Sequence, residues 1–196
     1  MSGITSLSNQ FGSTSPKNGQ YFIVAIDGRA GAGKTTFATY LKSLLSDFCF
    51  ICGDDYFEPI SHPITWGGYN EVRFFKDVIK PLQKTEKVVN YRPYTWEEEP
   101  HVNGRKLNIS RGVVIDRIYS FSFDLDYDLT IWVETPRAVA LKRGITRSSM
   151  PEDKAEKAWR EIWKPMEDQY ILETRPADKA SIVIDGTKPF SQQLSI

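Results

Sequence analysis

The stretch GRAGAGKTT, from Gly28 to Thr36, has the residue types and spacing needed to hold phosphate groups. The Walker A pattern G-x-x-x-x-G-K-[ST] is met at Gly28, Gly33, Lys34 and Thr35. Glycines let main-chain N–H groups approach phosphate oxygens, the lysine adds a point charge for the β and γ phosphates, and the threonine hydroxyl is the usual Mg²⁺ ligand. The alternative, a glycine turn without a ligand, would leave many backbone donors unpaired. We therefore expect a nucleotide-binding loop formed by Gly28, Arg29, Ala30, Gly31, Ala32, Gly33, Lys34, Thr35 and Thr36.

Acidic residues follow two other apolar runs of the sequence. Asp54 or Asp55, in GDDYF, could accept a proton from an acceptor hydroxyl, or the two acids could cap a turn or a helix. Asp116 ends the run GVVI, a position from which an acid reaches Mg²⁺ directly or through water; the alternative is a solvated strand end. Phosphoryl transfer needs charge neutralisation, Mg²⁺ and an aligned nucleophile, so these acids add to what the loop supplies.

Two further groups of residues suit a phosphate donor and its acceptor. Arg143 and Arg147 have i,i+4 spacing, so they share a helix face and could close on a triphosphate, although such pairs are equally common on solvated faces. Tyr91, Tyr94 and Trp96, in a segment without helical period, could form an acceptor pocket by stacking, or could pack a short sheet.

Five short apolar runs separate segments with helical or irregular patterns. Unbroken apolar runs of this length are typical of parallel strands covered on both faces, which predicts an α/β fold with helices on both sides of the sheet. In such sheets ligands gather at the carboxyl ends of the strands, so the loop, the two neighbouring acids and Asp116 should share one rim. The five runs are residues 22–26, 48–52, 112–115, 129–133 and 181–184.

The connecting segments carry their own patterns. Residues 1–19 are polar without a period, which predicts a flexible tail before one domain at 20–196. Asn70 can cap a helix that extends through Leu82. Asn103–Gly104 predicts the turn of a hairpin. The apolar stripe expected on the helix from Asn70 consists of Val72, Phe75, Val78, Ile79 and Leu82.

Composition limits the partners of this 196-residue chain. Lys plus Arg and Asp plus Glu number 25 each, so there is no overall basic field to collect nucleic acid, and small-molecule partners are expected. No run is long and apolar enough to cross a membrane and no export signal is present, which predicts a cytoplasmic protein. Cys49 and Cys52 form a C-x-x-C inside an apolar run and are interpreted as buried thiols. The sequence leaves open whether the chain forms a homo-oligomer.

The ordered set IDGRAGAGKTTFA, GDDYF, GVVIDRIYSF, DLTIWVETPRAVALKRGITR, WKPMEDQY and ADKASIVIDG resembles the uridine kinase branch of P-loop kinases. That branch is related to nicotinamide riboside kinase, pantothenate kinase and phosphoribulokinase. The resemblance covers residues 20–187. It implies a P-loop NTPase fold with a five-stranded parallel sheet, a small substrate-side hairpin, a helical lid at about 143–160, and ATP-dependent phosphorylation of a primary hydroxyl with Mg²⁺.

The resemblance also implies roles for individual residues. Asp54 matches the catalytic base, Asp116 lies where the family usually has Glu beside Mg²⁺ and the acceptor, and Arg143 and Arg147 match the lid arginines that act on the phosphates together with Lys34. Thr35 and Asp116 would hold the metal. Adenine would lie near Gly186 and Thr187. The acceptor residues implied are Asp54, Tyr56, Tyr91, Trp96 and Asp116.

The chain departs from the family pattern where the acceptor is read. Uridine kinases have a His five residues after the Tyr that matches Tyr91, and Trp96 takes that place. Arg92 and Arg117 replace the usual Asp and Gly. An indole nitrogen donates hydrogen bonds and cannot accept them. A nucleoside is the first expectation; a vitamin precursor or a sugar, or a nucleotide-dependent switch without a small acceptor, stay as alternatives.

Overall fold

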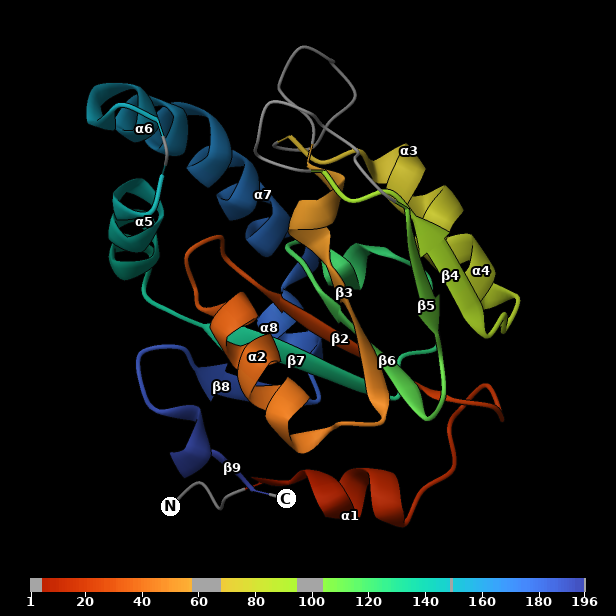
Figure 1. Cartoon of the computed structure of the whole chain (residues 1–196). Coiled ribbons are helices and arrows are strands. Elements are labelled where there is room, and N and C mark those ends of the chain that lie inside the picture. Colours follow the sequence, from red (N-terminus) through yellow and green to blue (C-terminus); the bar gives the residue numbers. More distant parts are fainter. Residues whose placement is uncertain (1–4, 58–67, 95–103, 149, 196) are drawn as a thin grey trace.

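The computed structural model describes residues 5–57, 68–94, 104–148 and 150–195. A five-stranded sheet with the order β3-β6-β2-β7-β8 lies at its centre, and every neighbouring pair of strands in it is parallel (Figure 1). Its strands are β2 (Phe22–Gly28), β3 (Phe48–Cys52), β6 (Gly112–Asp116), β7 (Leu129–Glu134) and β8 (Ile182–Asp185). The predicted α/β fold with a five-stranded parallel sheet is confirmed.

Helices cover both faces of the sheet, as Figure 1 shows. On one face, Phe37 and Leu41 of α2 pack in a core cluster with Val24 and Ile26 of β2. On the other face, Ile23 of β2 belongs to a second cluster under the run α3-η2-α4. Successive side chains of β2 point to opposite faces of the sheet and therefore contribute to two different cores. The helical elements that follow β2 and β3 are α2 (Lys34–Leu44), the 3₁₀ turn η1 (Gly53–Tyr56), α3 (Glu71–Phe74), the π-helical turn η2 (Phe75–Ile79) and α4 (Lys80–Gln83).

The helix predicted from Asn70 to Leu82 is present, but its apolar stripe differs from the expectation. The Asn70 side chain accepts a hydrogen bond from the Arg73 N–H at 2.8 Å and caps the helix. Val72 and Phe75 are 67% and 43% exposed, so their place in the stripe was wrong. The buried residues are three or four positions apart, or adjacent to such a position, and so lie on one face of the helix. They are Phe74, Val78, Ile79 and Leu82.

An antiparallel hairpin lies beside the main sheet. It consists of β4 (Val88–Tyr91) and β5 (Arg105–Asn108), and Tyr91 pairs with Arg105. β5 starts directly after the Asn103–Gly104 dipeptide, and its partner strand ends at Tyr91, so the turn expected at that dipeptide falls on the edge of the described residues and stays a prediction. The connection therefore comprises residues 92–104, and Trp96 and Asn103 lie outside the described residues.

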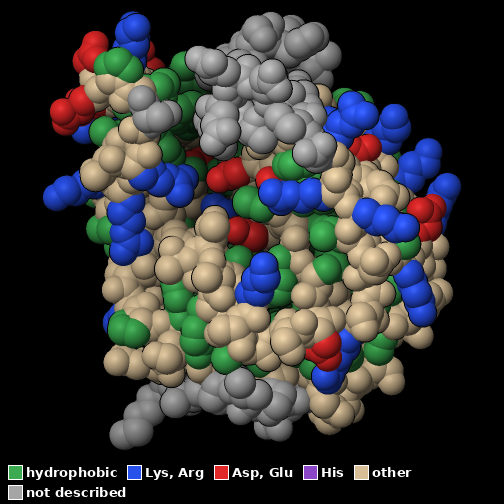
Figure 2. All heavy atoms as spheres, in the orientation of Figure 1, with side chains coloured by type: hydrophobic (Ala, Val, Ile, Leu, Met, Phe, Trp, Pro, Cys, Tyr) green, Lys and Arg blue, Asp and Glu red, His purple; other side chains and the backbone are tan. Residues whose placement is uncertain are grey.

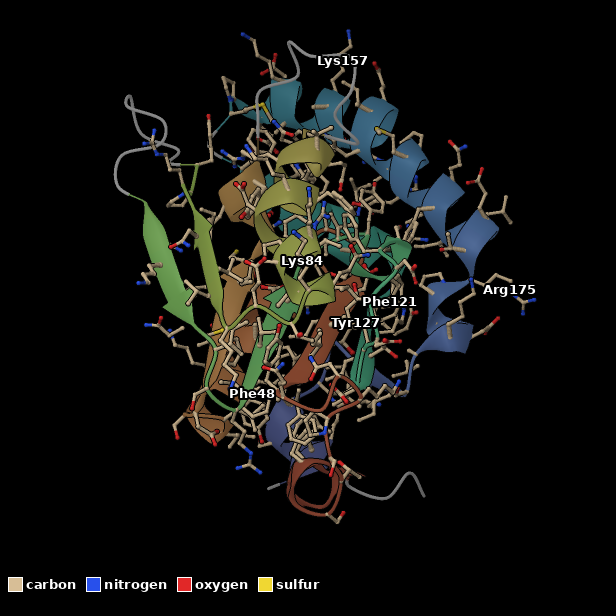
Figure 3. The ribbon with its side chains drawn as sticks, turned by 90° about the vertical axis from the view of Figure 1, so that its right-hand side faces the viewer. Phe48, Lys84, Phe121, Tyr127, Lys157 and Arg175 are labelled. Carbon is tan, nitrogen blue, oxygen red and sulfur yellow. The ribbon has the colours of Figure 1, made fainter. Side chains whose placement is uncertain are left out.

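The expected flexible tail is wrong for residues 5–12. β1 (Thr5–Ser6) pairs in parallel with β9 (Leu194–Ser195), and α1 (Leu7–Gly12) follows directly. Leu7 and Phe11 are buried, and the Phe11 ring lies 5.0 Å from that of Phe22 and 5.2 Å from that of Phe48. Figure 3 shows Phe48 at the end of the sheet nearest α1. Two apolar residues one helical turn apart thus anchor this segment.

A series of helices follows β7 and extends beyond the carboxyl ends of the strands. Figure 3 shows α6, η4 and α7 as one rod, with Lys157 near its start and Arg175 just past its end. Trp159 joins this rod to α5 in a cluster with Leu141 and Ala155. The remaining elements are η3 (Ser120–Ser122), α5 (Arg137–Thr146), α6 (Glu152–Ala158), the π-helical turn η4 (Trp159–Trp163), α7 (Lys164–Thr174), α8 (Pro176–Lys179) and η5 (Phe190–Gln192). Among the described helices, none has both the length and the apolar character to span a bilayer.

Candidate active site

The carboxyl ends of β2, β3 and β6 meet in a small cleft, which we call the phosphate cleft. Its volume is about 50 Å³, and its lining includes Lys34, Thr35, Asp54, Asp116 and Arg147. Figure 2 shows acidic and basic side chains side by side at the centre of this face. Residues far apart in the sequence are thus brought together because parallel strands end at the same edge.

The loop before α2 has the backbone geometry of a phosphate-binding turn. Gly31 and Gly33 have φ angles of +84° and +103°, which L side chains rarely adopt. A Cβ at Gly31 would lie 2.1 Å from the Ala140 carbonyl oxygen, so α5 packs directly on the loop. The Lys34 ammonium donates hydrogen bonds to the carbonyl oxygens of Gly28 at 3.0 Å and Arg29 at 3.2 Å. Its charge is therefore held over the loop.

Asp116 and Thr35 form the part of the cleft that suits a divalent cation. Asp116 is 6% exposed, and burial raises the pKa of its carboxyl to about 6, although the Lys34 charge and a hydrogen bond from the Thr35 hydroxyl oppose the shift. No group of three His, Cys, Asp or Glu side chains in the described part of the chain forms a complete metal site. Mg²⁺ usually takes one or two protein oxygens and completes its shell with phosphates and water. The Asp116–Thr35 pair fits that pattern.

The two acids of GDDYF have different environments. Asp54 lines the phosphate cleft, and its Oδ1 accepts a hydrogen bond from the Tyr69 hydroxyl at 2.7 Å. Asp55 turns toward the hairpin, where its Oδ2 accepts hydrogen bonds from the Tyr91 hydroxyl and from Arg105, both at 2.8 Å. The geometry therefore separates the two candidates for a base: Asp54 faces the cleft, and Asp55 attaches η1 to β4 and β5.

A second cavity extends from Asp54 toward η4 and α7, and we call it the lid pocket after the helical lid that the resemblance implies. Its volume is about 110 Å³, and its lining is mainly apolar and aromatic. Asp54 and Arg147 line both this pocket and the phosphate cleft. The other lining residues are Ala30, Phe57, Tyr69, Ile118, Tyr119, Trp159, Trp163 and Glu167.

A larger groove runs along the same loop, between α5 and the segment after β8. Its volume is about 690 Å³, and its lining includes Thr36, Arg143, Gly186, Thr187 and Phe190. An Arg143 N–H donates a hydrogen bond to the Gly186 carbonyl oxygen at 3.0 Å, which joins α5 to the segment after β8. The groove is large enough for a purine and its ribose.

Two of the aromatic residues expected at the acceptor, Tyr56 and Tyr91, lie in the protein core. Tyr56 and Tyr91 are 0% and 4% exposed, and their rings stack on each other with centroids 5.3 Å apart. Both rings therefore lie in the core under the hairpin. For Tyr91 this agrees with the second interpretation, in which the aromatic residues pack a short sheet. Trp96 lies outside the described residues.

Several residues of the site carried no signal in the sequence. Tyr69, Trp159 and Trp163 line the lid pocket, but isolated aromatics in a loop or a charged helix resemble ordinary packing. Arg117 is 2% exposed, forms two hydrogen bonds with Glu71 at 2.6 and 3.0 Å, and lies 4.3 Å from the Phe74 ring. The pair joins residues 46 positions apart, so no local spacing predicts it.

No protein-family model matches the chain. Among solved structures, a possible uridine kinase from Bacillus stearothermophilus superposes with a TM-score of 0.68 at 16% identity, covering 91% of this chain and 95% of the other. A proposed fructose transport system kinase from Silicibacter sp. TM1040 superposes with a TM-score of 0.67 at 17% identity, covering 91% of this chain and 97% of the other. The chain therefore has the fold of these two proteins, the P-loop α/β fold that the sequence predicted.

Proposed function

We propose that the chain is an ATP- and Mg²⁺-dependent kinase that phosphorylates a hydroxyl group of a small molecule, with a nucleoside as the first candidate. One observation carries this proposal: the carboxylate of Asp54 lines both the phosphate cleft and the lid pocket. An acid at the junction of a phosphate site and an apolar pocket is placed as a kinase needs it, between donor and acceptor.

The transfer assigns a role to each group of the cleft. The acceptor oxygen forms a bond to the γ-phosphorus while the bond from that phosphorus to the β–γ bridging oxygen breaks, and Asp54 takes the hydroxyl proton. Lys34 and the loop amides hold the transferring phosphate, and Arg147, which lines the cleft, neutralises charge that develops on it. Arg143, the other predicted arginine, lines the larger groove instead and bonds to the Gly186 carbonyl oxygen there. Thr35 and Asp116 would hold Mg²⁺, which neutralises phosphate charge when bound.

The lid pocket supports a transferase over a nucleotide-dependent switch. A switch needs a site for phosphate and a mobile segment, whereas this cleft opens into an aromatic-lined cavity. Within the described part of the chain, the indole N–H groups of Trp159 and Trp163 are buried without a hydrogen-bond partner. Both tryptophans line the pocket, so a ligand with hydrogen-bond acceptors would suit it. The mainly apolar and aromatic lining favours a flat ring over a sugar.

ADP release tests the proposal directly. The purified chain is incubated with ATP and Mg²⁺, and ADP formation is followed with each member of a panel of nucleosides, pantothenate and simple sugars. We expect one acceptor class to accelerate ADP release and to become phosphorylated in the same reaction. A slow release that no small hydroxyl compound changes would contradict the kinase assignment and favour the switch.

A further inference from the structure

The first turn of α7 contains a buried ion pair. Lys164 and Glu167 are 0% and 2% exposed, and the lysine Nζ lies 2.6 Å from the glutamate Oε2. Charged side chains are rarely buried this completely. A buried ion pair is also weak evidence for stability, because apolar side chains of similar volume often serve as well or better. The pair therefore calls for a role other than filling the core.

Both partners bond to the main chain of one residue of the phosphate loop. The Lys164 ammonium donates a hydrogen bond to the Ala30 carbonyl oxygen at 2.9 Å, and Glu167 Oε1 accepts one from the Ala30 N–H at 3.2 Å. The two polar groups of this residue are thus held from one side by a matched donor and acceptor. Methionine or leucine side chains could fill the same volume but could offer neither bond.

A neighbouring contact strengthens the attachment between α7 and the loop. Arg29 donates a hydrogen bond to Asp168 at 2.5 Å, and Asp168 also accepts one from Arg137 of α5 at 2.8 Å. Consecutive loop residues, Arg29 and Ala30, are therefore held by consecutive residues of α7. The Arg29 contact is made by its side chain, so it adds to the attachment of the loop to α7, whereas the bonds to Ala30 hold the main chain itself.

The same pair lies against the lid. The Lys164 Nζ is 5.2 Å from the centre of the Trp159 ring, a favourable position for a cation over an aromatic face. Trp159 packs so closely on α5 that a Cβ at Gly144 would lie 2.5 Å from its ring. Glu167 and Ala30 both line the lid pocket. The pair thus lies where loop, lid and pocket meet.

We propose that Lys164 and Glu167 are positioning residues that hold the Ala30 peptide so that the loop amides after it point at the phosphates. This inference rests on the proposed function insofar as the loop binds a nucleotide. Preorganised backbone donors are effective only in a fixed orientation, and a charged pair fixes both ends of a residue where an apolar pair cannot. The burial of the two charges then has a functional reason.

The experiment separates positioning from packing by measuring stability and ADP affinity in the same variants. Lys164→Met alone removes the closer of two cations from the buried Glu167 and leaves it with Arg29 at 3.9 Å, so we expect a loss of thermal stability. Lys164→Met with Glu167→Met removes both charges, and we expect the unfolding midpoint to return close to that of the wild type. In this double variant, ADP measured by calorimetry with Mg²⁺ should bind roughly ten- to hundredfold more weakly, the scale expected for misplaced catalytic geometry.

A double variant at an exposed ion pair serves as the control. Glu156 and Arg160 form an exposed ion pair of 2.8 Å. Replacing both by methionine makes the same chemical change on the surface and should leave ADP affinity unchanged.

The outcomes distinguish this inference from the proposed function. A stable double variant that binds ADP as tightly as the wild type would overturn the positioning role, whatever the acceptor is. A wild type that binds ADP while phosphorylating no acceptor would overturn the kinase assignment and leave the ADP comparison in force. A wild type that does not bind ADP would overturn both.

Discussion

The Tyr69 hydroxyl donates a hydrogen bond of 2.7 Å to Oδ1 of Asp54. This contact fixes one oxygen of the carboxylate and leaves the other for the junction between the phosphate cleft and the lid pocket. Tyr69 is itself placed by Arg117, whose guanidinium carbon lies 5.5 Å from the tyrosine ring centre, and by an edge contact with Phe57. The orientation of the proposed base therefore depends on side chains outside the β3 strand that precedes it.

Tyr69→Phe should lower the rate of phosphoryl transfer roughly ten- to hundredfold, because a hydrogen bond to a charged group contributes about 1.5–3 kcal/mol and the ring itself is retained. The KM for ATP should change little, since Tyr69 orients the base and not the nucleotide. Steady-state kinetics with the acceptor identified by ADP release provide the measurement. Tyr127→Phe is the matched control: it also removes a 2.7 Å hydrogen bond, to the Ser120 carbonyl oxygen, but away from Asp54. Equal rates in wild type and Tyr69→Phe would contradict the orienting role.

Asp116 should make the stability of the ligand-free protein fall as pH rises. Burial raises the pKa of this carboxyl from 3.8 to about 6, so the native state holds the proton more tightly than the unfolded state. The contribution to stability is therefore fully present below pH 4 and is lost as pH rises through 6. Two pKa units correspond to about 3 kcal/mol.

Urea unfolding of wild type and Asp116→Asn between pH 4 and 7, without Mg²⁺ or nucleotide, isolates this effect. The free energy of unfolding of the wild type should fall relative to that of the variant by up to about 3 kcal/mol across the range. Parallel pH profiles of the two proteins would show that Asp116 does not titrate abnormally.

The N-terminal helix should contribute to global stability. Phe11 is 5% exposed and packs on Phe22 and Phe48, so Phe11→Ala should lower the free energy of unfolding by about 3–5 kcal/mol. Leu172→Ala, at a residue that is 79% exposed, is the control and should change it by less than about 0.5 kcal/mol. Denaturant unfolding gives both values. If Phe11→Ala were as mild as the control, α1 would be a loosely attached segment after all.

Local patterns predicted much of the fold. The strand β2, the loop and α2 could be read from an apolar run, spaced glycines and helical periodicity, and Asn70 from its capping chemistry. The meeting of Lys34, Asp54 and Asp116 at one cleft follows from a general property of parallel sheets, whose strands end at the same rim. These features depend on short spacings or on topology.

What the sequence did not predict depends on contacts across long separations. Lys164 and Glu167 have the i,i+3 spacing of a solvated pair, and only the proximity of Ala30, more than 130 residues earlier, gives them their partners. A helix of six residues such as α1 carries too few apolar positions for a period to emerge. Tyr91 was an ambiguous aromatic because stacking on a ligand and stacking on Tyr56 require the same residue type.

Exchange of Asp54 for Asn tests the central claim most directly, with the adjacent Asp55→Asn as the matched control. Asp55 bonds to Tyr91 and to the half-exposed Arg105, so its variant should transfer phosphate within about threefold of the wild-type rate. Single-turnover transfer of labelled γ-phosphate to the acceptor is measured at saturating ATP. We predict that Asp54→Asn binds ATP nearly as well as the wild type but transfers phosphate about 10²–10⁴ times more slowly. Near-normal transfer by Asp54→Asn would contradict the account.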